Sequence, residues 1–220
     1  MRKMILTSMQ LAVALVVLAA AGARAQEPAT LPLPKPQIVG GKPLMQALNE
    51  RMSRRDFSTE KLPQQVLANL LWAAFGVNRA DGRRTAPSAS NMQELEIYAV
   101  MADGVYRYDA KAHALQLHLK EDLRAATGNN PWIATAPLNL LYVADYSKMG
   151  QRSEETKRVD SGTDSGFISQ NVYLFFTSEG LATVVRGGID RPAVAKTLKL
   201  RPDQHVVLAQ TVGYPPKSSL

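Results

Sequence analysis

The spacing of apolar residues along the chain alternates between the period of a helix and the period of a strand. Leu44, Leu48 and Met52 lie four residues apart, which predicts a helix that begins near residue 44. A second helix is expected after Pro63, because the apolar residues between 66 and 75 form one broad face at helical spacing. The pattern therefore predicts two amphipathic helices in this part of the chain.

After the second helix the pattern favours shorter elements. Gly76 is expected in the left-handed conformation that commonly ends a helix. Beyond it, apolar and polar residues alternate at the period of two or form short apolar runs. The predicted elements are a strand at 96–100, a hairpin at 104–119, a central strand at 139–144, a buried helix at 166–179 ended by Gly180, a strand at 181–185, a helix at 192–198 and a strand at 205–212.

These elements mix helices and strands without a regular strand–helix–strand rhythm. That order predicts an α+β fold with a mostly antiparallel central sheet flanked by helices. The chain has 220 residues and no evident internal repeat, which favours one domain, expected at 44–220. Residues 26–43 are rich in proline and are expected to form an extended arm, either a linker or a segment that wraps around a partner subunit.

The first 25 residues have the pattern of a secretory signal peptide. Arg2 and Lys3 precede an apolar stretch at 11–22, and Ala23-Arg24-Ala25 supplies the small residues of a cleavage site. The apolar stretch is shorter than the roughly 20 residues that cross a bilayer, although an uncleaved anchor stays an alternative. We therefore expect an exported protein, periplasmic or secreted, with cleavage after Ala25.

Composition and missing motifs exclude several function classes. The chain has no cysteine and a formal net charge of +7, too dispersed for nucleic acid to be expected as a partner. Neither a Rossmann nor a P-loop glycine motif occurs, and residues 162–166 have the wrong spacing for a serine nucleophile elbow. His113, His118 and His205 form no ligand pair at helix or strand spacing, so no metal site is expected.

The first candidate for ligand binding is the segment Arg51-Met52-Ser53-Arg54-Arg55. In a helix Arg51 and Arg55 share a face, whereas in an extended segment Arg51, Ser53 and Arg55 do. Either arrangement brings two guanidinium groups and a hydroxyl together, which suits a phosphate. The alternative is a solvated basic helix end that complements the helix dipole.

The second candidate is a loop of small residues, Pro87-Ser88-Ala89-Ser90-Asn91. Ser88 is placed to cap a helix, and the small side chains allow a flat ligand to lie against backbone N–H groups. Asn91 offers a donor and an acceptor, as the edge of a heterocycle requires. The alternative is an ordinary capped turn.

Two further candidates follow predicted strands. Gly187 and Gly188 come after the strand that ends near Val185, and they permit close approach of the backbone to a ligand. Lys217 lies just beyond the last predicted strand, in the sequence Gly-Tyr-Pro-Pro-Lys. For Lys217 the alternative is a frayed cationic tail.

Taken in order, these four segments resemble the nitroreductase family of FMN-dependent oxidoreductases, from about residue 44 to residue 217. The family's R-x-S-x-[RK] segment is matched by Arg51, Ser53 and Arg55. The resemblance implies that this segment, with Met52 and Arg54 between the matched residues, contacts the FMN phosphate and ribityl chain.

The other three segments match the family in the same order. Its P-S-x-x-N-x-Q loop, which lies along the flavin, is matched by Pro87, Ser88, Asn91 and Gln93. The resemblance further implies that the turn with Gly187 and Gly188 presents N–H groups near flavin N5. Lys217, after a "VGYP" ending, would complete the phosphate site.

One branch of the family is especially similar. The segment "LLWAAFGVNRADGRRTAPSA" at 70–89 resembles the branch that includes SagB-type dehydrogenases. Two departures stand out. Many nitroreductases continue the loop as N-x-Q-P-W, whereas here Gln93 is followed by Glu94-Leu95-Glu96. The thiazoline oxidases of the branch use a Lys-Tyr pair, which this chain lacks, so oxidation of peptide azolines is disfavoured.

The resemblance implies an FMN-dependent oxidoreductase that transfers hydride through flavin N5 by a ping-pong mechanism, to or from a small organic substrate and without a catalytic side chain. It also implies an intertwined homodimer with FMN at the interface, to which the arm and the helix at 166–179 would contribute. The electron donor would be NAD(P)H or, in a periplasm, an unknown reductant. The alternative is a non-enzymatic exported module that binds flavin or another ligand on the same fold.

Overall fold

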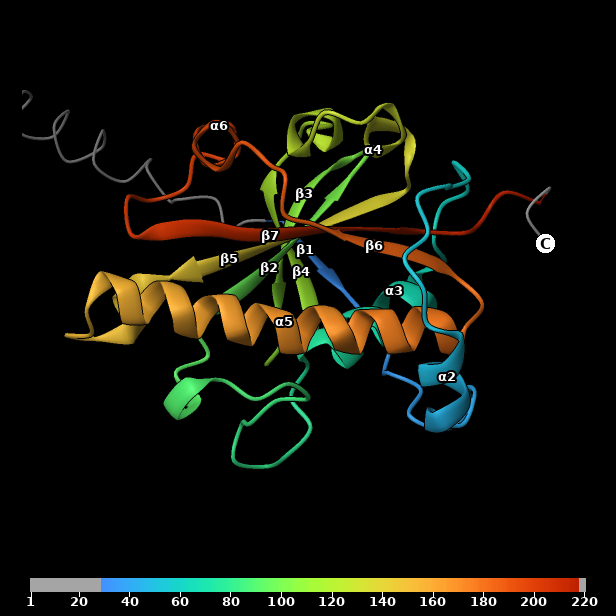
Figure 1. Ribbon diagram of the computed structural model, residues 1–220, viewed down its shortest axis with the longest axis horizontal. Helices are drawn as coiled ribbons and strands as arrows, with labels where there is room; N and C mark the ends of the chain where they lie inside the picture. Colours follow the sequence, from blue (N-terminus) through green and yellow to red (C-terminus); the bar gives the residue numbers. More distant parts are fainter. Residues whose placement is uncertain (1–28, 218–220) are drawn as a thin grey trace, which may run out of the picture.

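A seven-stranded sheet forms the centre of the computed structural model, which describes residues 29–217 (Figure 1). Its strand order is β1-β4-β3-β2-β5-β7-β6, and every neighbouring pair is antiparallel. The α+β fold with an antiparallel sheet is thus confirmed. The strands are β1 (Thr30–Pro32), β2 (Leu95–Met101), β3 (Gly104–Asp109), β4 (Ala114–Leu119), β5 (Leu138–Asp145), β6 (Ala182–Arg186) and β7 (Gln204–Gly213).

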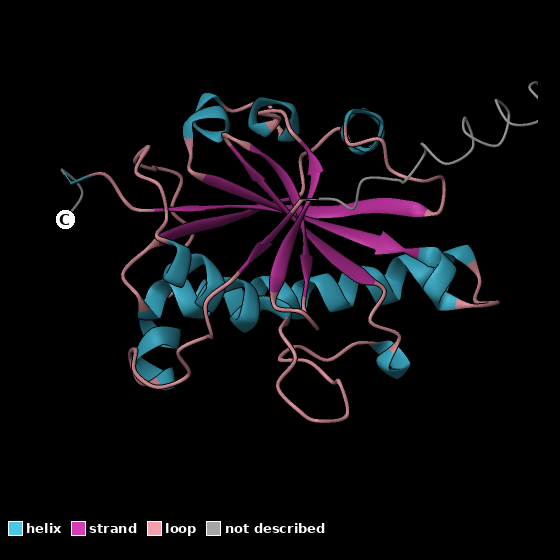
Figure 2. Cartoon of the chain, turned by 180° about the vertical axis from the view of Figure 1, so that it is seen from behind, coloured by secondary structure: helices cyan, strands magenta, loops and turns pink. Residues whose placement is uncertain are grey.

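Helices cover both faces of this sheet, and the two longest lie on the same side (Figure 2). The helices are α2 (Leu44–Glu50), α3 (Gln64–Phe75), α4 (Pro131–Thr135), α5 (Glu154–Ser178) and α6 (Arg191–Thr197), with 3-10 turns η1 (Ala89–Asn91), η2 (Arg124–Thr127) and η3 (Tyr146–Met149). Within residues 29–217 none of the helices has the length and apolar character needed to span a bilayer. The expected signal peptide and its cleavage site lie outside the described residues.

The alternation of side chains along the strands divides the core into two clusters. On β5, Leu140 and Tyr142 pack with α3 and α5, whereas Leu141 and Val143 pack with α6 on the opposite face. This is the period of two expected for a strand. Because both faces are covered, the central strand is buried along its whole length, as its continuous apolar run predicts.

The helix α5 begins twelve residues before the start expected at 166, so that boundary was wrong. Ser153 caps it by accepting a hydrogen bond from the Thr156 N–H, and two glutamates in the first turn favour the helix dipole. Its N-terminal half turns polar residues such as Asp164 and Ser165 toward the interior. Hydrophobic periodicity is therefore weak there, which hid this half of the helix.

The proline-rich arm is part of the sheet rather than a separate linker. Residues 30–32 pair with β4, and proline is tolerated there because β1 is an edge strand. The arm then crosses α3, where Gln65 donates to the Lys35 carbonyl and Asn69 accepts from the Gln37 N–H. The edge of the sheet and the surface of α3 are thereby covered by the same segment.

Gly76 is not left-handed, so that prediction was wrong. Its φ is −74°, and the glycine is needed because a Cβ there would lie 2.7 Å from Cα and O of Trp72. Close approach of two backbone segments, rather than a positive φ, explains this residue.

We predict opposite effects for two glycine substitutions measured by urea denaturation at equal protein concentration. Gly76→Ala should lower the free energy of unfolding by about 1–3 kcal/mol, because the new methyl group overlaps Trp72 backbone atoms. Gly162→Ala, inside α5 with open space around its Cβ position, should raise it by about 0.5–1 kcal/mol. Equal effects of the two substitutions would contradict the packing described for Gly76.

Candidate functional site

The segment after α2 is extended and runs beside the edge strand β6. Arg51 is the residue at which α2 ends, and the Arg54 N–H donates to the Thr183 carbonyl at 3.0 Å. Of the two arrangements considered for Arg51, Ser53 and Arg55, the structure therefore has the extended one. Arg51, Met52, Ser53, Arg54 and Arg55 are all at least partly exposed.

Tyr173 of α5 fixes this segment to the sheet. Its hydroxyl is hydrogen-bonded to the Ser53 hydroxyl at 2.8 Å and accepts a hydrogen bond from the Val185 N–H at 2.9 Å. The Arg51 guanidinium lies 5.2 Å from the centroid of the Tyr173 ring, within range of a cation–π contact. Sequence reasoning missed this residue, since a tyrosine on a helix predicted to be buried gives no sign of a hydrogen-bonding role.

The positive charges of the segment have no anionic partner in the part of the chain that the structure describes. Within residues 29–217, Arg51, Arg54 and Arg55 form no salt bridge with a carboxylate. The C-terminal segment joins the same region, because the Ser58 N–H donates to the Tyr214 carbonyl at 2.8 Å, and the exposed Lys217 follows three residues later. Unpaired guanidinium groups beside a hydroxyl are the donor set that a phosphate requires.

Gly187 and Gly188 leave the sheet immediately after β6. Both are exposed, and a Cβ at either position would meet nothing within 4 Å. In the described part of the chain neither N–H group donates to a protein acceptor. The turn therefore offers two backbone donors to a ligand. It begins two residues after Val185, whose N–H donates to the Tyr173 hydroxyl.

A buried arginine fixes the start of this turn. The Arg186 guanidinium donates to Thr211 Oγ1 at 3.0 Å, to Asn139 Oδ1 at 3.1 Å and to both the carbonyl and the hydroxyl of Thr127. Burial lowers the pKa of Arg186 to about 10, so the side chain stays protonated at neutral pH. In the sequence Arg186 stands directly before the two candidate glycines, but its role as a buried anchor was not predicted; the available signal was a lone arginine at the end of an otherwise apolar strand.

The loop of small residues lies elsewhere, against the N-terminal half of α5. The Ala89 N–H donates to Asp164 Oδ2 at 2.8 Å, and Arg152 donates to the Ser90 hydroxyl at 2.9 Å. Figure 1 shows η1, in green, and the segment after α2, in teal, near opposite ends of α5. Asp164 and Tyr173 are nine residues apart, which is about 13–14 Å along a helix. The structure thus places the segment at 51–55 along β6, the strand that leads into Gly187 and Gly188, and bonds the C-terminal segment before Lys217 to residue 58; it leaves Pro87, Ser88 and Asn91 apart from them.

The backbone of this loop is held in an uncommon conformation. Ser90, Asn91 and Gln93 have φ values of +51°, +55° and +50°, a region that residues other than glycine seldom occupy. Ser88 does not cap η1 as predicted; its hydroxyl accepts a hydrogen bond from the Gln93 N–H instead. Such conformations persist only where surrounding contacts enforce them and are concentrated at functional sites.

Gln93, which matches the family's loop motif, has its side chain occupied by the protein itself. It accepts from the Arg84 guanidinium at 2.8 Å and donates to the Gly82 carbonyl at 3.1 Å. These bonds tie the loop of small residues to the preceding turn at 78–84. The role of Gln93 in this chain is therefore to shape the loop.

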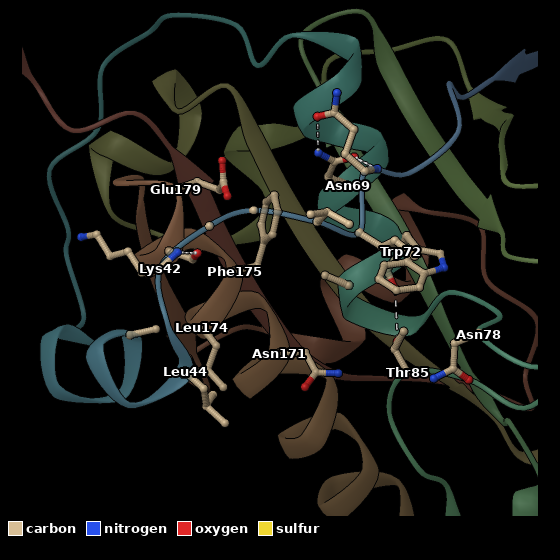
Figure 3. A pocket seen from close by; sticks show the side chains of 18 residues that line it. Lys42, Leu44, Asn69, Trp72, Asn78, Thr85, Asn171, Leu174, Phe175 and Glu179 are labelled. Carbon is tan, nitrogen blue, oxygen red and sulfur yellow. Dashed lines mark hydrogen bonds between the residues drawn. The ribbon is translucent and has the colours of Figure 1, made fainter.

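Two hollows lie next to these segments. One, of about 680 Å³, lies where β7 extends beyond β6, between α5 and α6, and its lining includes Arg191, three residues after Gly188. The other, of about 540 Å³, lies between α2, α3 and α5, with Leu44, Trp72 and Phe175 on its walls (Figure 3). Of the two, the first is backed by strand β7 and has Arg191, close to the glycine turn in sequence, in its lining.

The chain matches the model of the nitroreductase family over residues 48–214. The chain belongs to the nitroreductase family. Its family is thus one of oxidoreductases.

Individual relatives support this assignment. A curated protein of Methanocaldococcus jannaschii, provisionally named a nitroreductase, is 33% identical over 187 residues, covering 77% of this chain and 90% of the relative. A crystal structure from Ralstonia eutropha JMP134, also provisionally titled a nitroreductase, has a TM-score of 0.82 at 37% identity, covering 87% of this chain and 94% of that one. NADPH:FMN oxidoreductase from Vibrio harveyi, complexed with NAD+, shares the fold, with a TM-score of 0.60 at 21% identity over 79% of this chain and 69% of its own.

We predict that Tyr173→Phe lowers the free energy of unfolding by about 1–3 kcal/mol, because the Val185 N–H loses its acceptor. Tyr146→Phe is a suitable control, since no hydrogen bond of its hydroxyl is found within the described residues, and it should change stability by less than about 0.5 kcal/mol. Chemical denaturation of both variants provides the measurement. Equal stability of Tyr173→Phe and the wild type would show that the Tyr173 hydroxyl does not fix the segment to β6.

Proposed function

We propose that this protein is an FMN-dependent oxidoreductase of the nitroreductase family, related to its SagB-type branch. The observation that carries the proposal is the set of donors along β6: guanidinium groups that form no salt bridge within the described residues, a hydroxyl beside the strand, and two backbone N–H groups directly after it. Family membership makes FMN the ligand that fits this set of donors best. The alternative function is a binding module without redox activity. It would use the same donors, and the reduction experiment below distinguishes the two functions.

In this proposal the phosphate end of FMN lies at the segment after α2. Arg51, Ser53 and Arg55 supply two charged groups and a hydroxyl, and Lys217 adds a third charge from the C-terminal segment. The phosphate carries close to two negative charges, and hydrogen bonds to it from guanidinium groups are among the strongest that proteins form. Met52 and Arg54 line the same segment.

When bound, FMN supplies hydride transfer at its N5 position, which no side chain of this chain provides. The protein's contribution is to orient the group and to stabilise negative charge. Gly187 and Gly188 direct two N–H donors toward the ring, and they are pre-organised because Arg186 fixes the residue before them. The buried positive charge of Arg186 lies at the same place and favours electron density nearby.

A homodimer completes the site in this proposal. Pro87, Ser88 and Asn91 lie against the N-terminal half of α5, away from Arg51 and Gly187 of the same chain, and in this proposal the loop of a second copy covers the flavin. The surface around α2 is suited to such contact, since Leu44 is 61% exposed and Met45 is 75% exposed. Large apolar side chains of this kind, gathered on one helix, mark interaction surfaces.

The electron donor and the substrate would bind one after the other in the hollow beside the glycine turn. Its volume of about 680 Å³ is in the range of small-molecule sites. With FMN bound, this hollow would admit an electron donor and, after it has left, a small organic acceptor. If the protein is exported, as its first 25 residues suggest, the donor is a periplasmic reductant; otherwise NAD(P)H serves.

The first test is removal of the proposed phosphate contacts. Arg51→Ala/Arg55→Ala should reduce FMN affinity at least about 100-fold, because each charged hydrogen bond contributes about 1.5–3 kcal/mol. Fluorescence titration of FMN gives the affinity, and circular dichroism checks the fold. Arg83→Ala/Lys111→Ala removes the same charge from exposed positions elsewhere and should bind FMN normally. Unchanged affinity in the first variant would show that the phosphate lies elsewhere.

Dimerisation provides a second test. Met45→Asp places a charge on the exposed apolar side of α2 and should yield a folded monomer that no longer retains FMN. Ala193→Asp, on exposed α6, is the matched control and should remain a dimer. Sedimentation and the visible absorption spectrum of each variant report both properties. A monomeric variant that binds FMN as well as the wild type would overturn the shared site.

Reduction separates the enzyme from the binding module. FMN-loaded protein should be reduced by a donor and reoxidised by a nitroaromatic or quinone acceptor under anaerobic conditions. Protein that binds FMN but exchanges no electrons with any donor and acceptor tried would favour the module.

A further inference from the structure

Glu94 is a carboxylate placed where a carboxylate should not be stable. It is the last residue before β2, the residue is 0% exposed, and no N–H or O–H donor among residues 29–217 bonds to either of its carboxylate oxygens. Burying an ionised carboxylate without donors is strongly unfavourable. The group must therefore be stabilised in another way.

The neighbouring group is a second carboxyl. Asp164 of α5, only 3% exposed, lies within hydrogen-bonding reach of Glu94. Two ionised carboxylates are both acceptors and repel each other, so a hydrogen bond between them requires one to carry a proton. Asp164 already accepts the Ala89 N–H at 2.8 Å, which favours its ionised form. The proton therefore belongs on Glu94, which donates it to Asp164.

The surrounding charges favour retention of this proton. Burial first, and the negative charge of Asp164 and Asp160 next, raise the pKa of Glu94 to about 7, and burial also raises the pKa of Asp164. Asp160 pairs with Arg152 at 3.4 Å, so that cation is already engaged with another carboxylate. The charged groups on the elements next to Glu94 are Asp160, Lys157 and Asp164 on α5, Arg152 before it, Arg84 beside Gln93, and Asp145 and Lys148 after β5.

This cluster is not arranged as a metal site. No group of three histidine, aspartate or glutamate side chains within residues 29–217 is placed to hold a metal ion. The geometry instead forms a single line, from the Glu94 carboxyl through the Asp164 carboxylate to the Ala89 N–H in the loop of small residues. This chain of hydrogen bonds ends at the backbone of the loop.

We propose that Glu94 and Asp164 share one proton, and that this proton holds the loop at 87–93 in its left-handed conformation, which makes Glu94 a positioning residue for the loop. The departure from N-x-Q-P-W in this chain places Glu94 at the position of that proline. The role of the loop as a cover for flavin rests on the proposed function; its dependence on the proton does not.

The proposal has a defined dependence on pH. The ordinary value for a glutamate is 4.5, whereas the pKa of Glu94 in the folded loop is about 7. Between these values the closed loop holds one more proton than the opened loop. Raising the pH through this window therefore weakens the closed loop, and the loss is complete above the folded value. At pH 8 the two ionised carboxylates repel each other and Asp164 no longer anchors Ala89 firmly.

Hydrogen exchange on the protein without FMN tests this directly. In the wild type, after correction for the intrinsic effect of pH, exchange in the peptide that contains Ala89 should increase about tenfold per pH unit between pH 5 and 7. Glu94→Gln should abolish this increase, because the amide donates an N–H to Asp164 at every pH. Asp160→Asn is the matched control: it removes a charge one turn away on α5 and should leave most of the increase intact.

Several outcomes would overturn the proposal. Exchange in the wild type that does not respond to pH, or that responds equally in Glu94→Gln, would show that no proton is shared. If Glu94→Gln fails to fold, infrared spectra of the wild type decide: a protonated carboxyl band at pH 6 that disappears by pH 8.5 supports the pair, and its absence at pH 6 refutes it. All of these readouts are independent of FMN, so failure of the proposed function leaves them unchanged.

Discussion

The buried guanidinium of Arg186 is the interaction on which the candidate site depends. Arg186 is the last residue of β6, and β7 continues for five more residues beyond that point. The Arg186 side chain fixes the end of β6 because it bonds to β5, β7 and η2 at once. An arginine can make these bonds where a lysine cannot, because its planar group has several donors in fixed directions. The chain is thereby made to leave the sheet at Gly187, and the free part of β7 becomes the back of a hollow.

The partners of Arg186 explain why its charge is tolerated inside the protein. All four acceptors are neutral groups, and within the described residues no carboxylate neutralises it. Its charge is therefore compensated only by dipoles, and part of its field extends to the turn that follows. A buried pair with a carboxylate would have cancelled that field. The site gains an electrostatic bias from the same contact that shapes it.

Much of this could be predicted from the sequence, where local pattern and global structure agree. The helix α3 was predicted because burial of one face leaves apolar residues at helical spacing. The strand β5 was predicted because burial of both faces leaves a continuous apolar run. The first half of α5 was missed because its inner face carries Asp164 and Ser165, which pair with groups distant in sequence. The roles of Tyr173, Arg186 and Glu94 are set by such distant partners, so the local pattern around each residue did not show its role.

The position of β7 has a consequence for how the chain acquires its structure. It is the last described element in sequence, yet it lies inside the sheet, between β5 and β6. Until β7 has been synthesised, β5 has an open edge and β6 has no partner. A chain that emerges from its N-terminus therefore passes through a stage with exposed strand edges, a state prone to aggregation. Completion of the sheet, and of the turn that follows β6, must wait for the final strand to insert.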